Sequence, residues 1–420
     1  MIKMLKMSPY SYPEQVSSSQ LSKDLNDAYS QEDIVIENYV PTPSRGISRE
    51  VRRKFKKIKY EERNDGKIII HRFAMFPEGK NPILRAVRYM LVSIRQLQLA
   101  SKSKDVDIIY SASTPPTQGV LCGTMKKKLV RRYGHHVPYL YCLQDVFPDS
   151  LVNSNMTRQG SLIWKIGRKI EDYTYRSADR IIVISQDIKD NIMGKGVPAE
   201  KISVIPNWID TETVRPVPRS ENKLFDELGI SREGFYVTYA GNLGKAQSID
   251  TILEAAESLI EVPDIQFIIF GEGSGKEEAE RKAGSLPNVR MFPLMPPERV
   301  PEVYSLGDVS IVCCKKGFGK GAIPSKTVSI MATGTPVMLS FDRDSELWKL
   351  IEDHDCGFLC DAEDAAALSE AVREAKDHRE MIENKGQNAL DLVKSEYSKE
   401  YGPKEYISVI RQLVSSNNKD

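Results

Sequence analysis

The sequence contains few cysteines, no long apolar run and almost no net charge. Six cysteines in 420 residues are too sparse to imply a disulfide framework. No stretch approaches the ~18 uninterrupted apolar residues of a transmembrane helix, and the first residues lack the apolar segment of a secretory signal. We therefore expect a cytoplasmic protein. The net charge of +1 also argues against a general nucleic-acid-binding protein, because such proteins usually carry a clear basic excess.

The charge is distributed unevenly along the chain. Residues 1–200 hold 33 Lys and Arg against 21 Asp and Glu, a net charge of +12, and the remaining residues carry −11. This asymmetry indicates that one half of the chain meets an anionic surface or ligand.

One cluster, His354, Cys356 and Cys360, has the residue types of a zinc site. A structural zinc site needs four ligands, and no second pair of Cys or His accompanies this cluster. Partly buried thiols are the simpler interpretation, and we expect no bound metal.

Short apolar strands alternate with helical patterns. The predicted strands are Ile34–Ile36, Ile68–Ile70, Val106–Tyr110, Tyr139–Leu143, Ile181–Ile184, Tyr236–Ala240, Gln266–Phe270, Val309–Val312 and Pro336–Leu339. Continuous Val and Ile runs separated by helices are typical of parallel sheets covered on both faces. The sequence therefore predicts an α/β fold with two doubly wound, Rossmann-like domains. Prolines between Pro206 and Pro218 favour an extended linker, so we place one domain at 1–207, a second at 208–395, and at 396–420 a helical tail that crosses back to the first.

Two basic segments have apolar residues at helical spacing. In Pro82–Ala100, Ile83, Val87 and Met90 are among the residues that share one face, while Arg85 and other arginines lie elsewhere. Val51–Arg63 has a similar pattern. A basic amphipathic helix either lies in a membrane interface or packs its apolar face on the protein core, and the sequence leaves both interpretations open.

Of three candidate segments in the second half, the first and the third suit a phosphate-bearing ligand. Small residues in Gly241–Gln247 follow a strand and precede a helix, which lets backbone N–H groups approach a phosphate. The turn Gly271–Lys276 also follows a strand, but it lacks the spacing of a Walker P-loop, which excludes an ATPase on this segment. The third segment, Lys315–Thr327, holds four lysines in an otherwise acidic half. In the first half, Asp145 follows a predicted strand and is a candidate for acid/base or hydroxyl-positioning work.

A set of motifs in this order along the chain resembles the retaining glycosyltransferases of family 4, and more narrowly their WbuB-like surface-polysaccharide branch. The matching motifs are Tyr12–Gln15, Thr114–Pro116, Gln144–Ser150, Ala178–Ser185, Ile205–Asp210, Tyr239–Gly244, Gly271–Gly273, Pro324–Lys326 and Ala332–Val337. The resemblance implies the GT-B fold, in which two Rossmann-like domains face each other across a cleft. It further implies that the first domain holds an acceptor and the second a nucleotide-sugar donor.

The resemblance also assigns site residues. The implied donor-binding residues are Gly241, Asn242, Lys245, Gln247, Gly271, Glu272, Leu294, Lys320, Pro324, Ser325, Lys326 and Thr327. The implied catalytic residues are Asp145 and Glu14. The donor is expected to be a UDP-sugar, bound as a substrate without a metal or cofactor.

The implied activity is sugar transfer with retention, by a hexosyl- or N-acetylhexosaminyl-transferase, to a lipid-linked or saccharide acceptor. The reaction would serve lipopolysaccharide or capsule synthesis, at the inner face of the cell membrane. One family feature is missing: Gly321 and Ser329 occupy the two positions at which the family has its paired glutamates. A catalytically silent subunit that binds a partner glycosyltransferase therefore remains an alternative, as does a nucleotide-sugar epimerase of the same fold.

Overall fold

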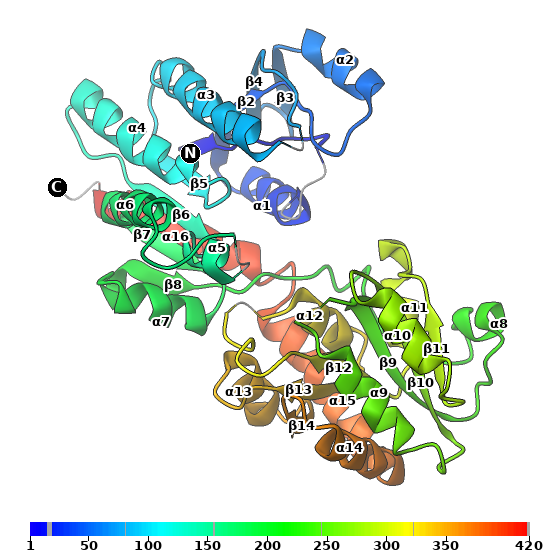
Figure 1. Ribbon diagram of the computed structural model, residues 1–420. Coiled ribbons are helices and arrows are strands. Elements are labelled where there is room, and N and C mark those ends of the chain that lie inside the picture. The colour runs from blue at the N-terminus through cyan, green and yellow to red at the C-terminus, as the bar shows by residue number, and fades with distance from the viewer. Residues whose placement is uncertain (15–18, 80, 154–155, 245, 322, 418–420) are drawn as a thin grey trace. The chain divides into compact units, whose positions relative to one another are not determined.

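The chain folds into two α/β units, which Figure 1 shows coloured along the sequence. The computed structural model describes residues 1–14, 19–79, 81–153, 156–244, 246–321 and 323–417. Unit 1 contains Met1–Ile205 and the chain from Pro403 onward, and unit 2 contains Pro206–Gly402.

The division differs slightly from the predicted domain boundaries. Unit 2 begins at Pro206, two residues before the predicted start of the second domain, and it also includes residues 396–402 of the predicted tail. The reason is a short pairing inside unit 2: the Ile209 amide donates to the Tyr397 carbonyl at 2.8 Å, and the Lys399 amide donates to the Ile209 carbonyl at 3.0 Å. Gly402 lies directly against the Trp208 ring, where a Cβ would clash.

Unit 1 is built on an eight-stranded sheet. Its strands are β1 (Ile2–Met7), β2 (Ile34–Pro41), β3 (Tyr60–Arg63), β4 (Ile68–Phe73), β5 (Ile108–Ala112), β6 (Tyr139–Leu143), β7 (Arg180–Val183) and β8 (Ile202–Val204). Its helices are α1 (Ser19–Gln31), α2 (Arg49–Lys57), α3 (Pro82–Ala100), α4 (Thr117–Tyr133), α5 (Asp149–Asn153), α6 (Leu162–Ser177), α7 (Gln186–Gly194), η1 (Ala199–Lys201) and α16 (Gly402–Asn417). The strand order is β3-β4-β2-β1-β5-β6-β7-β8, and only β3 runs antiparallel to its neighbour.

Helices cover both faces of this sheet. On one face, the Lys6 ammonium of β1 donates to Ser22 and Asn26 of α1, and Cys142 of β6 contacts the Tyr406 hydroxyl of α16 at 2.9 Å. On the opposite face, apolar residues of β1, β5, β6 and β7 pack with α4 and α6 in one buried cluster.

The two basic segments fold differently from each other. α2 ends at Lys57, and Tyr60–Arg63 forms strand β3, so a single helix over Val51–Arg63 was wrong in its second half. α3 forms as predicted, but Ile83, Leu84 and Met90 are more than half exposed. The predicted apolar face is thus divided: its N-terminal residues lie at the surface, whereas Leu97 packs against the buried cluster of unit 1.

Unit 2 has a six-stranded, fully parallel sheet. Its strands are β9 (Phe235–Asn242), β10 (Ile265–Glu272), β11 (Val289–Phe292), β12 (Val309–Cys313), β13 (Val337–Phe341) and β14 (Gly357–Asp361). Its helices are α8 (Leu224–Leu228), α9 (Ile249–Glu257), α10 (Lys276–Ala283), η2 (Pro297–Arg299), α11 (Val300–Tyr304), α12 (Ser325–Ala332), α13 (Glu346–Asp353), α14 (Ala365–Asp377) and α15 (Arg379–Glu396). Two buried clusters, one on each side of the sheet, form its core.

The strand order of unit 2 is β11-β10-β9-β12-β13-β14, which is the 3-2-1-4-5-6 order of a doubly wound Rossmann sheet. Unit 1 contains the same order from β4 to β7, with β3 and β8 added at the edges. The prediction of two Rossmann-like domains is confirmed. In such sheets a ligand binds beyond the carboxyl ends of the strands, where the order reverses, and in unit 2 this point lies between β9 and β12. Among the described helices, none is long and apolar enough to span a membrane.

Candidate functional site

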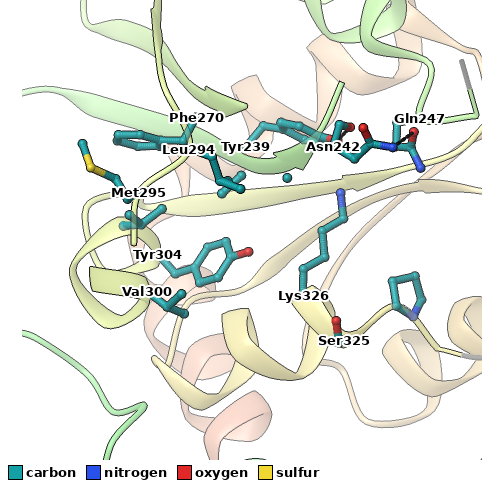
Figure 2. Close-up of a pocket in the computed structure, with 14 residues that line it drawn as sticks. Tyr239, Asn242, Gln247, Phe270, Leu294, Met295, Val300, Tyr304, Ser325 and Lys326 are labelled. Carbon is teal, nitrogen blue, oxygen red and sulfur yellow. Dashed lines mark hydrogen bonds between the residues drawn. The ribbon is translucent and has the colours of Figure 1, made fainter. Parts of the chain in front are cut away.

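A pocket of about 360 Å³ lies in unit 2 at the point where the strand order reverses (Figure 2). The lining residues come from the ends of β9 and β10, from the segment after β11, from α11 and from the start of α12. They are Tyr239, Ala240, Gly241, Asn242, Gln247, Phe270, Leu294, Met295, Val300, Val303, Tyr304, Pro324, Ser325 and Lys326.

The pocket has an apolar end and a polar end. Figure 2 shows Phe270, Met295 and Val300 on one side, away from Asn242 and Gln247. The Phe270 ring stacks on Phe292, with ring centres 5.6 Å apart, which holds the apolar wall in place. Such a division suits a ligand with a planar apolar group at one end and a charged group at the other.

Lys326 supplies the positive charge of the polar end. Its side chain extends from the first turn of α12 toward Asn242 (Figure 2), and its Nζ lies 4.1 Å from the centre of the Tyr239 ring. Among the residues that the structure describes, no carboxylate forms an ion pair with this ammonium. Burial lowers the pKa of Lys326, and the neighbouring Cys313 and Cys314 thiols partly offset this effect.

The start of α12 adds a second attraction for an anion. Pro324 precedes the helix, and no side chain caps its N-terminus. The backbone N–H groups of a helix N-terminus attract negative charge, and Lys326 lies in that first turn. The polar end is therefore suited to a phosphate group.

The turn after β9 is held in place by its own contacts. Gly241 has a φ of +149°, a conformation that favours glycine, and the nearest atoms to a Cβ there belong to Tyr239 and Lys326. The Cys313 thiol donates to the Gln247 carbonyl at 2.7 Å, and the Lys315 amide donates to the Ala246 carbonyl at 2.8 Å. These bonds fix the turn against β12.

Seven of the predicted donor-binding residues line the pocket: Gly241, Asn242, Gln247, Leu294, Pro324, Ser325 and Lys326. Lys245 lies outside the described residues. Gly271, Glu272, Lys320 and Thr327 do not line the pocket, and each has another environment in the structure.

The reasons are specific to each of those four residues. A Cβ on Gly271 would lie 2.5 Å from the Leu243 side chain, so this glycine permits close packing. Glu272 is exposed and pairs with Lys276 at 2.7 Å, and Lys320 is exposed and pairs with Asp344 at 2.6 Å. Thr327 is fully buried. The four lysines of Lys315–Thr327 therefore do not gather in the pocket, where Lys326 alone among them is a lining residue.

The two predicted catalytic carboxylates both belong to unit 1, beyond the ends of its strands. Asp145 is exposed, two residues after β6. Glu14 is buried, and burial raises its pKa. Its Oε1 accepts from the Ser44 and Arg45 amides at 2.8 and 3.0 Å, and its Oε2 accepts from the Ser11 amide at 3.1 Å. Through these bonds Glu14 links its own loop, which contains Ser11, to the loop that contains Ser44 and Arg45.

Sequence reasoning missed the aromatic part of the pocket. Tyr239 and Phe270 lie at the ends of predicted strands, and Tyr304 lies in α11, far along the chain. Tyr239 and Phe270 could have been predicted as site residues, because they lie next to the predicted turns at the strand ends. Neither Gly321 nor Ser329 lines the pocket, and no described lining residue is acidic. Within the described chain, no group of three His, Cys, Asp or Glu residues is placed to hold a metal ion.

Comparison with known proteins assigns both units to glycosyltransferases. A family model described as "Glycosyl transferases group 1" matches residues 220–391, and one described as "Glycosyltransferase Family 4" matches residues 40–213. The solved structure of Anabaena Alr3699/HepE in complex with UDP superposes with a TM-score of 0.65 and 16% identity, covering all of both chains.

Three curated relatives carry related names. "Probable glycosyltransferase WbjE" of Pseudomonas aeruginosa is 24% identical over 76% of this chain and 78% of the relative. "Putative colanic acid biosynthesis glycosyl transferase WcaI" of Escherichia coli K12 is 27% identical over 56% and 58%. "UDP-Gal:alpha-D-GlcNAc-diphosphoundecaprenol alpha-1,3-galactosyltransferase" of Escherichia coli is 24% identical over 54% and 60%. The last two matches thus span less than two thirds of those relatives.

The chain has the GT-B fold and belongs to the glycosyltransferases. The chain is family 4-like, since the two family models follow each other along it in the order of its two units.

Proposed function

We propose that this chain transfers a hexosyl or N-acetylhexosaminyl group from a UDP-sugar to a lipid-linked or saccharide acceptor, with retention, in surface-polysaccharide synthesis. The single observation that carries the donor part is the position of Lys326, a half-buried ammonium at a helix N-terminus without a carboxylate partner among the described residues. A nucleoside diphosphate would place its phosphates there and its base at the apolar end.

The proposed chemistry follows from the charge of the leaving group. When the sugar–phosphate bond breaks, negative charge grows on the phosphate oxygens. Lys326 and the N–H groups at the start of α12 would stabilise that charge, so we expect transfer to continue in the presence of a chelator. Asp145 would position the reacting sugar or the acceptor hydroxyl.

Relatives support the acceptor part. The galactosyltransferase of Escherichia coli is named for an acceptor sugar on diphosphoundecaprenol, and WcaI is named for colanic acid biosynthesis. A lipid-linked acceptor would place the protein at the inner face of the cell membrane, and the basic excess of residues 1–200 suits an anionic surface there.

The proposal is tested by incubating the full chain with a panel of nucleotide sugars and polyprenyl-diphosphate sugars, and by following nucleotide release and product mass. Transfer from a UDP-sugar is the expected result. Nucleotide binding without transfer to any acceptor would favour the silent subunit, which the lack of an acidic lining residue motivates. Conversion of the donor sugar without an acceptor would favour the epimerase.

A further inference from the structure

Helix α3 turns an apolar face toward solvent. Six large apolar side chains on it are exposed by 38% to 73%, namely Ile83, Leu84, Val87, Met90, Leu91 and Ile94. At about 100° per residue, these six positions cover a continuous arc of about 120° around the helix. A face of this kind is unusual on an isolated surface helix, because exposed contiguous apolar patches mark binding surfaces.

The opposite face of α3 is buried and carries the polar residues Arg88 and Gln96 beside Val92 and Ala100, which fixes the rotation of the helix. Arg88 is fully buried, and its guanidinium donates to the Phe76 carbonyl at 3.1 Å and lies 3.4 Å from Glu78. Gln96 is also fully buried, and its amide donates to the Ser8 and Tyr39 carbonyls. The helix cannot rotate its apolar arc inward without leaving these buried polar groups unpaired, which is costly.

The neighbouring helices extend this surface. α4 packs beside α3, where Ser93 contacts Thr117 at 3.2 Å, and it packs against α6 through Gly119 and Gly123. At its N-terminus, α6 exposes Leu162, Ile163 and Ile166 by 51% to 74%. Because each of these three helices leads into a parallel strand, their N-terminal turns lie at the same edge of the sheet.

Positive charge accompanies the apolar residues. The exposed cations on α3, α4 and the start of α6 are Arg85, Arg95, Lys127, Lys128, Arg131, Arg132 and Lys165. α3 and α4 contain no acidic residue, and the two acids of α6 are both in ion pairs with Arg168. We name the exposed residues of α3, α4 and the start of α6 the α3 face.

We propose that the α3 face docks unit 1 on an anionic lipid surface. Exposed apolar side chains beside lysines and arginines are what an interfacial helix needs, since the former enter the acyl boundary and the latter meet lipid phosphates. Charge complementarity favours lipid over a second copy of the chain, because two α3 faces would bring like charges together. The inference rests on the proposed membrane acceptor for its purpose, but its test does not use sugar transfer.

The test is flotation of the full chain with vesicles of phosphatidylglycerol and phosphatidylcholine, and with phosphatidylcholine alone. We expect recovery with the anionic vesicles, and a loss of at least about tenfold in apparent affinity when Leu84, Val87 and Leu91 are all changed to Gln. Gln is a good helix former, so α3 should persist, and an unchanged melting temperature checks this. The double variant Lys128→Gln/Arg131→Gln should bind anionic vesicles more weakly and leave binding to neutral vesicles unchanged. High salt should have the same effect.

Matched controls lie elsewhere in unit 1. Met193→Gln on α7 removes an apolar side chain of 39% exposure, and Lys23→Gln removes an exposed charge on α1, which covers the other face of the sheet. Both should bind vesicles like the wild type. Equal recovery of wild type and triple variant would overturn the proposal, as would a wild-type dimer in solution that the triple variant dissociates without loss of vesicle binding. Transfer to a water-soluble acceptor, measured separately, shows whether the proposed function fails on its own.

Discussion

The ammonium of Lys326 lies 4.1 Å from the centre of the Tyr239 ring. The lysine comes from the start of α12 and the tyrosine from the end of β9, so this contact joins the two segments on which the polar end of the pocket is built. The Tyr239 hydroxyl donates to the Asn242 carbonyl at 2.7 Å, which keeps the ring in place under the lysine. An aromatic ring stabilises the cation without neutralising it, and leaves its charge available to a ligand.

Changing Lys326 to Met should weaken UDP binding by about 10–100-fold, because a charge-assisted hydrogen bond to phosphate is lost. Isothermal titration calorimetry measures this directly. The variant should melt no lower than the wild type, since the half-buried charge is costly in the free protein. The matched control is Lys282→Met on α10, which breaks an exposed pair with Asp250 of α9 and should bind UDP normally. Unchanged UDP affinity in Lys326→Met would remove this residue from the donor site.

UDP affinity should also depend on pH through the same group. Burial lowers the pKa of Lys326 from its ordinary value of 10.5, and a bound diphosphate would raise it again by favouring the charged form. The affinity should therefore be constant below the lowered pKa and fall as the pH rises from there toward 10.5. Calorimetry in buffers of different ionisation enthalpy would detect proton uptake on binding in this range. The uptake should be absent in Lys326→Met.

Gly271 should prove to be a packing residue. Gly271→Ala should lower the free energy of unfolding by about 1–3 kcal/mol, because its Cβ would overlap the Leu243 side chain. Leu243→Ala makes room, so the double variant should be more stable than the sum of the two single changes by about 0.5–3 kcal/mol. Urea denaturation of the four proteins measures this coupling. A stable Gly271→Ala variant that fails to bind UDP would instead assign the glycine to the ligand.

Asp145→Asn should reduce kcat by at least about 10²-fold if this carboxylate takes part in the reaction. UDP binding should not change, because the pocket is lined entirely by residues of unit 2 and Asp145 belongs to unit 1. Stability should not change either, since the side chain is exposed. A kcat close to that of the wild type would exclude Asp145 from catalysis.

Glu14→Gln should act on stability. One carboxylate oxygen becomes an amide nitrogen that faces backbone N–H donors and cannot accept from them, which costs about 1–3 kcal/mol. Thermal or urea unfolding measures the loss, and Glu50→Gln at an exposed position of α2 is the control. Loss of transfer at full stability would restore Glu14 as a catalytic candidate.

Much of the fold was predictable because buried parallel strands need continuous apolar runs. The nine predicted strands all overlap strands of the structure. β1 was not predicted, since Lys3 and Lys6 interrupt its apolar residues. Lys6 is nevertheless buried, because Ser22 and Asn26 of α1 supply acceptors for its ammonium. Local composition cannot reveal partners that lie sixteen or more residues away.

The same limit applies to the polar end of the pocket and to the α3 face. The sequence by itself determined two Rossmann-like domains, the turns at the strand ends, and where lysines and apolar helix positions occur. Only the tertiary structure decided which lysine of Lys315–Thr327 lines the pocket. Lys320 pairs with Asp344, whereas Lys326, in the first turn of α12, places its ammonium over the Tyr239 ring of β9. It also decided that α3 buries Arg88 and Gln96 and exposes its apolar arc. Periodicity defines the faces of a helix, whereas the neighbours available to its polar groups determine which face is buried.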